Sequence, residues 1–156
     1  MLAKPKRILW PTDFSAHSLR GGRYASGLCT LFDAELHIVH TIPPPLTPDA
    51  SLVVPADIPV ACSEAELFEA SKRSLAELVR KHIADQPRVV THVSFGNPWP
   101  TICKYAKDKE IQLIVVTTHG RTGLGHALIG STAERIVQHA PCPVLVVKEK
   151  ECGFLE

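Results

Sequence analysis

Residues 113–134 read LIVVTTHGRTGLGHALIGSTAE, which predicts a strand, a glycine-rich loop and the beginning of a helix. The strand is apolar from Leu113 to Val116, whereas a strand with one face in water alternates apolar and polar side chains. Strands without this alternation are typical of parallel sheets that helices cover on both faces. The stretch therefore favours an α/β fold.

The rest of the chain repeats this alternation of strand and helix. The expected strands are residues 8–10, 36–42, 89–95, 113–117 and 144–147, and the expected helices are residues 15–32, 63–83, 98–109 and 132–140. Strands and helices that alternate at this spacing predict a three-layer α/β/α, Rossmann-like fold with a five-stranded parallel sheet. Ligands of such sheets bind beyond the carboxyl ends of the strands, where the strand order reverses.

Length and composition suit one globular domain, expected over residues 1–150 of the 156, with a short C-terminal tail at 151–156. A formal net charge of +1 gives no reason to expect a nucleic acid or an anionic membrane surface as a partner. Neither a transmembrane segment nor a signal peptide is recognisable. The five cysteines are widely spaced and odd in number, which argues against a disulfide framework and a zinc ribbon, so a reduced cytoplasmic protein is expected.

Residues 42–62 interrupt the alternation, because they contain six prolines, at positions 43, 44, 45, 48, 55 and 59. Proline lacks an amide donor and fixes φ, so the segment is neither a helix nor a central strand. It is also long for a connection inside a compact domain. Since it leaves the carboxyl end of the second strand, it is either a surface excursion or a lid over a ligand.

The glycine-rich loop has the features of a phosphate site. Residues 120–130 contain four glycines, which let backbone amides approach a ligand closely and form an anion-binding nest. Ser131-x-x-Glu134 reads as a capping box, so a helix should begin near Ser131 and direct its first amides at an anion. Ser131 and Thr132 add hydroxyl groups, and Arg121 adds a positive charge. The alternative is a flexible linker followed by an ordinary helix cap.

Two familiar phosphate motifs do not occur in the sequence. No glycine is followed by Lys-Ser or Lys-Thr, which excludes a P-loop. The loop reads G-x-x-G-x-G and follows the fourth strand, whereas a dinucleotide fingerprint reads G-x-G-x-x-G and follows the first. The first strand is followed instead by Asp13, which could cap the first helix or bond a ribose hydroxyl or an adenine amine. The two oxygens of a carboxylate allow both roles.

The histidines and carboxylates predict neither a metal site nor a catalytic set. His37 and His40 stand three residues apart on an expected strand, so they point to opposite faces. His119 and His126 flank the glycine loop, but no cysteine or aspartate is spaced to complete a zinc site. No pair of carboxylates and no Ser–His–Asp arrangement stands out.

The opening ILWPTDFS, at residues 8–15, and the ending APCPVLVV, at residues 140–147, resemble the first strand and the last third of the universal stress protein family. The resemblance covers nearly the whole chain. Nucleotide-binding members of the family carry the pattern G-x2-G-x9-G-[ST]. Gly120, Gly130 and Ser131 match its last three fixed positions, whereas the first position is Thr117.

This resemblance implies an adenine nucleotide alpha hydrolase-like fold with strand order 3-2-1-4-5. It also implies bound ATP, with AMP or ADP as alternatives and Mg²⁺ held through the phosphates. The adenine would contact Pro11, Thr12, Asp13 and the backbone at Thr41. The rest of the nucleotide site would comprise Thr117, Thr118, His119, Gly120, Arg121, Thr122, Gly123, Gly130, Ser131, Thr132 and Ala133. The last strand, Val144–Val147, would pair with its copy in a homodimer that acts in a stress response or in signalling, with a protein partner of unknown identity.

Two other functions remain open. The Cβ of Thr117 could crowd a nucleotide, or its hydroxyl could bond one, and a crowded site would leave a protein-interaction module of the same fold. The other possibility is an adenine-nucleotide hydrolase. It is disfavoured because pyrophosphatase relatives carry Ser-Gly-Gly after the first strand, where this chain has Thr12-Asp13-Phe14. Any ATP hydrolysis should be slow, since no general base can be named.

Overall fold

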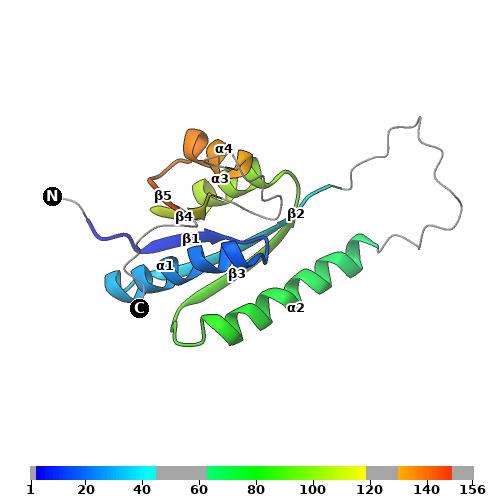
Figure 1. Cartoon of the computed structure of the whole chain (residues 1–156), viewed down its shortest axis with the longest axis horizontal. Coiled ribbons are helices and arrows are strands. Elements are labelled where there is room, and N and C mark those ends of the chain that lie inside the picture. The colour runs from blue at the N-terminus through cyan, green and yellow to red at the C-terminus, as the bar shows by residue number, and fades with distance from the viewer. Residues whose placement is uncertain (1–2, 45–62, 119–129, 149–156) are drawn as a thin grey trace, which may run out of the picture.

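The computed structural model describes residues 3–44, 63–118 and 130–148. Its strands are β1 (Arg7–Pro11), β2 (Glu35–Ile42), β3 (Val89–Phe95), β4 (Leu113–Thr117) and β5 (Val144–Val147). Its helices are α1 (Ala16–Phe32), α2 (Glu64–His82), α3 (Pro98–Asp108) and α4 (Ser131–His139). Figure 1 shows them in chain order. Most of the proline-rich segment 42–62, the loop residues His119–Gly123 and the tail 151–156 lie outside the described residues.

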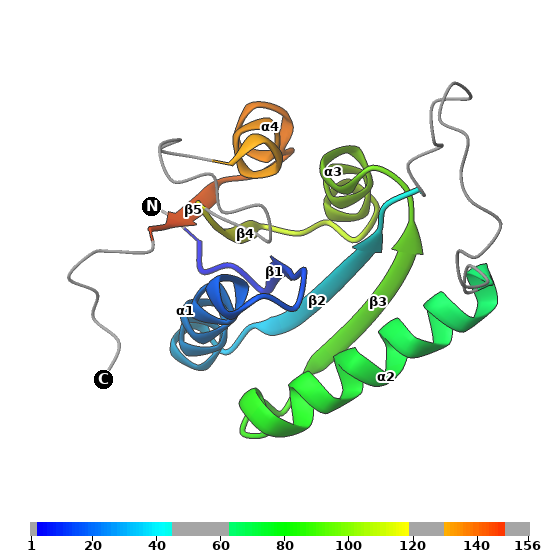
Figure 2. The ribbon, with the colours of Figure 1, turned by 45° about the vertical axis from the view of Figure 1, so that its right-hand side comes forward.

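The five strands form one parallel sheet in the order β3-β2-β1-β4-β5, as predicted. Figure 2 shows α1 and α2 on one face of the sheet and α3 and α4 on the other, which confirms the three-layer α/β/α architecture. The chain leaves β1 toward β2 on one side and later returns to place β4 on the other side. The strand order therefore reverses between β1 and β4, which is where such folds bind ligands.

Two hydrophobic clusters, one on each face, explain why Ile8–Trp10 of β1 and Leu113–Val116 of β4 are continuous apolar runs. Trp10 and Ile38 pack in the cluster under α1 and α2, while Leu9 and Val39 pack in the cluster under α3 and α4. Consecutive residues of one strand thus belong to opposite clusters, because side chains alternate along a strand. His37 and His40 follow this rule and lie on opposite faces, as predicted: His37 contacts Tyr105 of α3, and His40 contacts Phe14.

Two glycines let α1 lie close against the sheet. A Cβ on Gly22 would stand 2.5 Å from Cη2 of Trp10, so any side chain there would displace the indole or the helix. A Cβ on Gly21 would stand 3.0 Å from the Cγ2 methyl of Thr117 at the end of β4. This close approach positions the amino end of α1 beside the carboxyl ends of β1 and β4.

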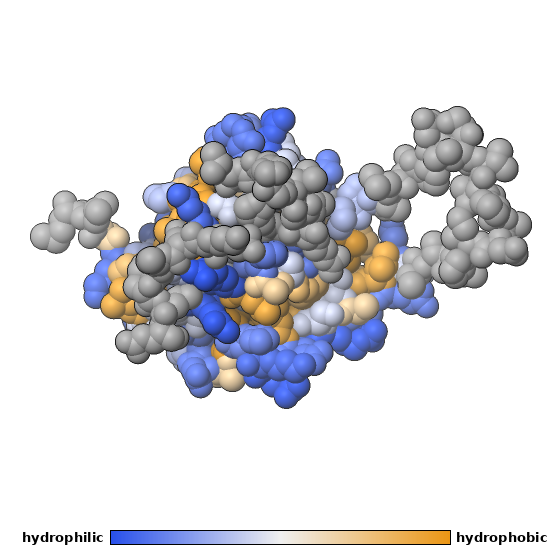
Figure 3. Space-filling view, viewed as in Figure 1, coloured by the Kyte–Doolittle hydropathy of each residue, from blue (hydrophilic) through white to orange (hydrophobic). Residues whose placement is uncertain are grey.

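A partly apolar surface remains next to the amino end of α2, where Figure 3 shows hydrophobic colour beside that helix. The rings of Phe68 and Phe95 stack with their centroids 6.1 Å apart, and Leu67 and Phe95 are each 40% exposed. Among the residues that the structure describes, no helix is long and apolar enough to cross a membrane.

Candidate functional site

A cavity of about 340 Å³ lies at the carboxyl edge of the sheet, where the strand order reverses. All the predicted site residues that the structure describes line it, and they are Pro11, Thr12, Asp13, Thr41, Thr117, Thr118, Gly130, Ser131, Thr132 and Ala133. The remaining predicted site residues, His119, Gly120, Arg121, Thr122 and Gly123, lie outside the described residues. Sequence positions more than 100 apart are therefore brought to one cavity.

The cavity also has walls that the sequence reasoning missed. The additional lining residues are Ser18, Val39, His40, Pro43, Pro98, Ile102, Val116 and Ile136. Val39 lies two positions before Thr41 on β2, so the alternation of side chains could have identified it as a neighbour of Thr41 on the same face. Val116 directly precedes Thr117 on β4. Ile102 and Ile136 come from the facing sides of α3 and α4 and carry no comparable sequence signal.

The turn after β1 is held by its own hydrogen bonds. The amide of Thr12 donates to the carbonyl of Val39 at 2.9 Å, and Nδ1 of His40 lies 2.8 Å from the carbonyl oxygen of Thr12. The hydroxyl oxygen of Thr12 accepts from the amide of Phe14 at 3.1 Å and from the hydroxyl of Ser18 at 3.0 Å. Thr12 is thus a positioning residue whose side chain is used inside the protein.

Asp13 supports the cap of α1 but is not the cap itself. Its Oδ1 accepts from both the amide and the hydroxyl of Ser15, at 2.9 and 2.6 Å. Ser15 is the N-cap residue, and its side chain accepts from the amide of Ser18. Phe14 between them has a φ of 64°, in the left-handed region that residues with a side chain rarely adopt. The turn is therefore strained and rigidly fixed, which holds Asp13 at the cavity.

The start of α4 differs from the predicted capping box. Gly130, not Ser131, is the N-cap residue, and among the described residues no side chain caps this helix. The amide of Gly130 donates to the carbonyl of Thr118 at 2.5 Å, and this bond fixes Gly130 in an extended conformation one residue earlier than expected. Glu134 then falls one position too late to complete a capping box.

Gly130 has a structural reason to be glycine, because a Cβ there would lie 3.0 Å from the carbonyl oxygen of Thr118. The first helical residues, Ser131, Thr132 and Ala133, all line the cavity. Their amides belong to the group that an α-helix leaves without intrahelical partners at its amino end. With the helix dipole they supply a positive potential to the cavity. Among the described lining residues there is no lysine or arginine.

The side chain of Thr117 points away from the α3 and α4 side of the sheet. Its Cγ2 methyl approaches Gly21 of α1, on the face opposite to the neighbouring Val116. Thr117 borders the cavity at the end of β4. The absence of a side chain on Gly21 gives the methyl group of Thr117 its space.

A second hollow, of about 390 Å³, lies on the α1 side of the same edge. It shares Thr117 and Thr118 with the cavity. Basic side chains line it, namely His17, Arg20, Arg23 and Lys148. The carboxyl edge of the sheet therefore carries a largely uncharged cavity on one side and a basic hollow on the other.

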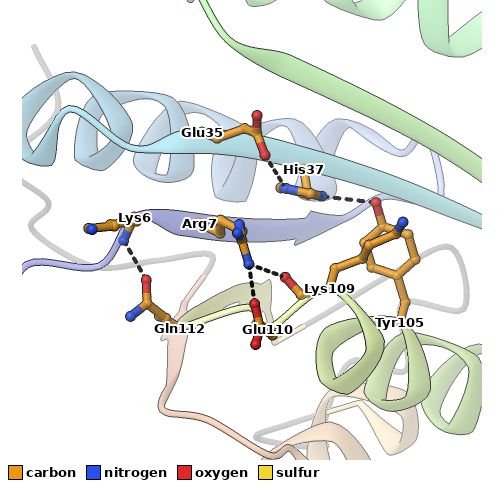
Figure 4. A network of polar contacts seen from close by, with 8 residues as sticks. All are labelled: Lys6, Arg7, Glu35, His37, Tyr105, Lys109, Glu110 and Gln112. Atoms are coloured by element: carbon orange, nitrogen blue, oxygen red, sulfur yellow. Dashed lines mark hydrogen bonds and ion pairs between the residues drawn. The ribbon is translucent and has the colours of Figure 1, made fainter.

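His37 of β2 is a buried titratable group that does not line the cavity. Figure 4 shows His37 between Glu35 and Tyr105, with Nε2 2.8 Å from Oε1 of Glu35 and Nδ1 2.9 Å from the hydroxyl of Tyr105. Burial lowers the pKa of His37 below its ordinary value of 6.5, although the hydrogen bond to Glu35 acts in the other direction. Among the described residues, no cluster of three histidine, cysteine or acidic side chains could hold a metal ion.

Comparison with known proteins agrees with this architecture. A universal stress protein from Methanocaldococcus jannaschii is 35% identical over 148 residues, which span 92% of this chain and 82% of that protein. The solved structure of universal stress protein UspA from Lactobacillus plantarum superposes with a TM-score of 0.73 at 31% identity and covers 94% of this chain and 99% of its own.

A universal stress protein from Archaeoglobus fulgidus, solved in complex with dAMP, has the same fold, with a TM-score of 0.63 at 18% identity over 93% of this chain and 98% of its own. The sequence model of the universal stress protein family matches residues 4–148. The chain belongs to the universal stress protein family.

Proposed function

We propose that this protein binds an adenine nucleotide, with ATP as the expected ligand, in the cavity at the carboxyl edge of the sheet. The observation that carries the proposal is the convergence of the predicted residues on one cavity whose wall includes the uncapped start of α4. The dAMP complex of a relative with the same fold supports an adenine nucleotide as the ligand class.

The order of the strands gives the ligand a direction. Thr41 is the last residue but one of β2, Asp13 follows β1 and Thr118 follows β4, and these strands are neighbours in that order. Parallel strands stand about 4.8 Å apart, so the outer two of these positions are separated by about 10 Å. We assign the phosphates to the amides at the start of α4, the ribose to Asp13 and the base to the β2 end.

The donors at the phosphate end suit anions. Amides of a first helical turn bind phosphate oxygens, and the hydroxyls of Ser131 and Thr132 are additional donors. Because Asp13 is the only carboxylate among the described lining residues, Mg²⁺ would be held mainly by the phosphates. The orientation of Thr117 toward Gly21 supports nucleotide binding over the alternative of an obstructed site.

In this proposal the bound nucleotide changes how the protein associates. β5 is the last strand of the sheet on its side, and Val144–Val146 are half-buried, so a second copy could pair along this edge. Hydrolysis would be slow, because Asp13 is the only carboxylate among the described lining residues and the proposal assigns it to the ribose. Free thiols at Cys29, Cys103 and Cys142 suit a reducing compartment such as the cytoplasm.

Calorimetric titration of the nucleotide-free protein with ATP and Mg²⁺ tests the proposal, with AMP and GTP as comparisons. The decisive variant is Thr132→Glu, which places a carboxylate in the exposed first turn of α4 beside the expected phosphates. Repulsion should weaken ATP binding by about 100-fold, while an acidic residue at a helix start should leave the melting temperature unchanged or raise it.

The matched control is Gln138→Glu, which adds the same charge to the last turn of α4 away from the cavity. Its ATP affinity should stay within about twofold of the parent value, because solvent screens distant exposed charges. If the parent protein gives no binding heat and no thermal shift at millimolar ATP, the proposal is wrong. Equal weakening by both variants would also contradict it.

A further inference from the structure

The side chain of Thr41 differs from its neighbours in the cavity wall. Thr41, near the end of β2, is 8% exposed, and its Oγ1 finds no hydrogen-bond partner among the described residues. Buried polar groups are nearly always paired, because an unmade hydrogen bond away from water is costly. An unpaired hydroxyl in a native structure therefore needs an explanation.

The alternation along β2 directs Thr41 to the cavity side. His37 reaches Tyr105 of α3, and Val39 packs in the cluster of α3 and α4. Thr41 follows at the same interval of two, so its side chain leaves the same face of the sheet. There it lines the cavity, together with Val39 and with Ile102 of α3.

A comparison with Thr12 shows that the fold can satisfy a threonine at this edge. Thr12 also lines the cavity and is 6% exposed, but its Oγ1 bonds to Phe14 and Ser18. Of these two threonines, Thr12 is satisfied inside the protein, whereas the hydroxyl of Thr41 has no bond to another described residue. The hydroxyl of Thr41 is therefore the one of the two that can pair with a ligand.

Ser94 supplies a second comparison. It is the register partner of Thr41 on β3, and its Oγ also finds no partner among the described residues. Ser94, however, is not among the residues that line the cavity. Both buried hydroxyls therefore have no partner among the described residues, but only Thr41 lines the cavity, which makes Ser94 a matched control.

We propose that the hydroxyl of Thr41 hydrogen-bonds the polar edge of the bound base and so determines base affinity. The inference rests on the proposed adenine-nucleotide function and adds a side-chain contact at the base end of the site. A hydroxyl both donates and accepts, so it can pair with a ring nitrogen or with an exocyclic amine. Thr41 is about 10 Å from the phosphate end, which is too far for direct phosphate contact.

The test compares Thr41→Val, which replaces the hydroxyl by a methyl group of similar size, with Ser94→Ala. Calorimetry measures the Kd of each variant for ATP with Mg²⁺ and for inorganic tripolyphosphate, which has phosphates but no base. Thr41→Val should weaken ATP binding about threefold to tenfold, the effect of one neutral hydrogen bond. It should leave tripolyphosphate binding and the melting temperature of the empty protein unchanged or slightly raised. Ser94→Ala should match the parent protein for both ligands.

Three results would overturn the inference. One is ATP binding by Thr41→Val equal to that of the parent protein. Another is equal weakening of ATP and tripolyphosphate, which would indicate general damage to the site. The third is a fall of several degrees in the melting temperature of empty Thr41→Val, which would mean that the hydroxyl has a partner within the protein. Failure of the parent protein to bind ATP would refute the proposed function itself, and the inference with it.

Discussion

The helices α1 and α4 both begin at the carboxyl edge of the sheet, and their starts are built in opposite ways. At α1, Ser15 caps the helix and Asp13 holds Ser15. At α4, the cap position is Gly130, which has no side chain to offer. Within the described part of the chain, side chains thus cap the start of α1 and none caps the start of α4, where the proposed function places the phosphates. The contrast separates residues that maintain the fold from residues that remain available to bind.

Two alanine substitutions would sharpen this contrast most. Ser15→Ala removes the cap of α1 and the hydroxyl contact with Asp13, although the amide of residue 15 can still donate to Asp13. It should therefore lower the free energy of unfolding by about 1–2 kcal/mol. Ser131→Ala removes a hydroxyl that caps no helix among the described residues, so its free energy of unfolding should stay within about 0.5 kcal/mol of the parent value. Urea unfolding measures both.

The same pair should behave differently with nucleotide. Ser131→Ala should weaken ATP binding, because a phosphate donor is lost, although the protein is as stable as its parent. If Ser131→Ala instead destabilised the empty protein as much as Ser15→Ala does, the start of α4 would have an internal cap and the contrast would be wrong.

Thr117→Gly tests whether the side chain at the end of β4 serves the packing of α1 or obstructs the nucleotide site. The side chain of Thr117 packs toward Gly21 of α1, so its removal should cost stability, on the order of 1 kcal/mol, through lost packing and a more flexible strand. ATP affinity should be nearly unchanged, because the methyl group points away from α4. Calorimetry that showed much tighter ATP binding would mean that Thr117 obstructs the nucleotide.

The smallest expected effect is a change of folding stability with pH. It should arise at His37, which does not line the cavity. Burial lowers the pKa of His37 below 6.5, so near and below that pH the unfolded chain binds more protons than the folded one. Stability should therefore fall as pH decreases through this range and be restored as pH rises. His37→Gln should give a shallower dependence of melting temperature on pH. An unchanged slope would assign the titration to other groups.

The sequence predicted the fold well because its signals are local. The apolar run of Leu113–Val116 and the helix expected over residues 63–83 each depend on neighbouring residues, and they are present as β4 and α2. The grouping of Asp13 with Ser131 at one cavity followed from the parallel topology and from the family resemblance. These predictions need no knowledge of side chains distant in the chain.

The predictions that failed or stayed open depend on distant contacts. The bond between Gly130 and Thr118 moves the cap of α4 and overrides the local capping pattern. The direction of Thr117 depends on Gly21, almost a hundred residues earlier in the chain. The unpaired hydroxyl of Thr41 has no sequence signature, because a threonine reads the same whether or not its surroundings offer a partner.

The hydrogen bond between Thr118 and Gly130 also has a consequence for protein engineering. It links the residue before the stretch 119–129 to the residue after it, so the end of β4 and the start of α4 are held together by a contact outside that stretch. The entropic cost of closing a loop rises only slowly with its length, so stretches of other lengths and sequences can be exchanged between fixed ends. An insertion between Thr118 and Gly130 should therefore change the stability of the fold little, so a reporter or a foreign recognition loop can be grafted at these two residues.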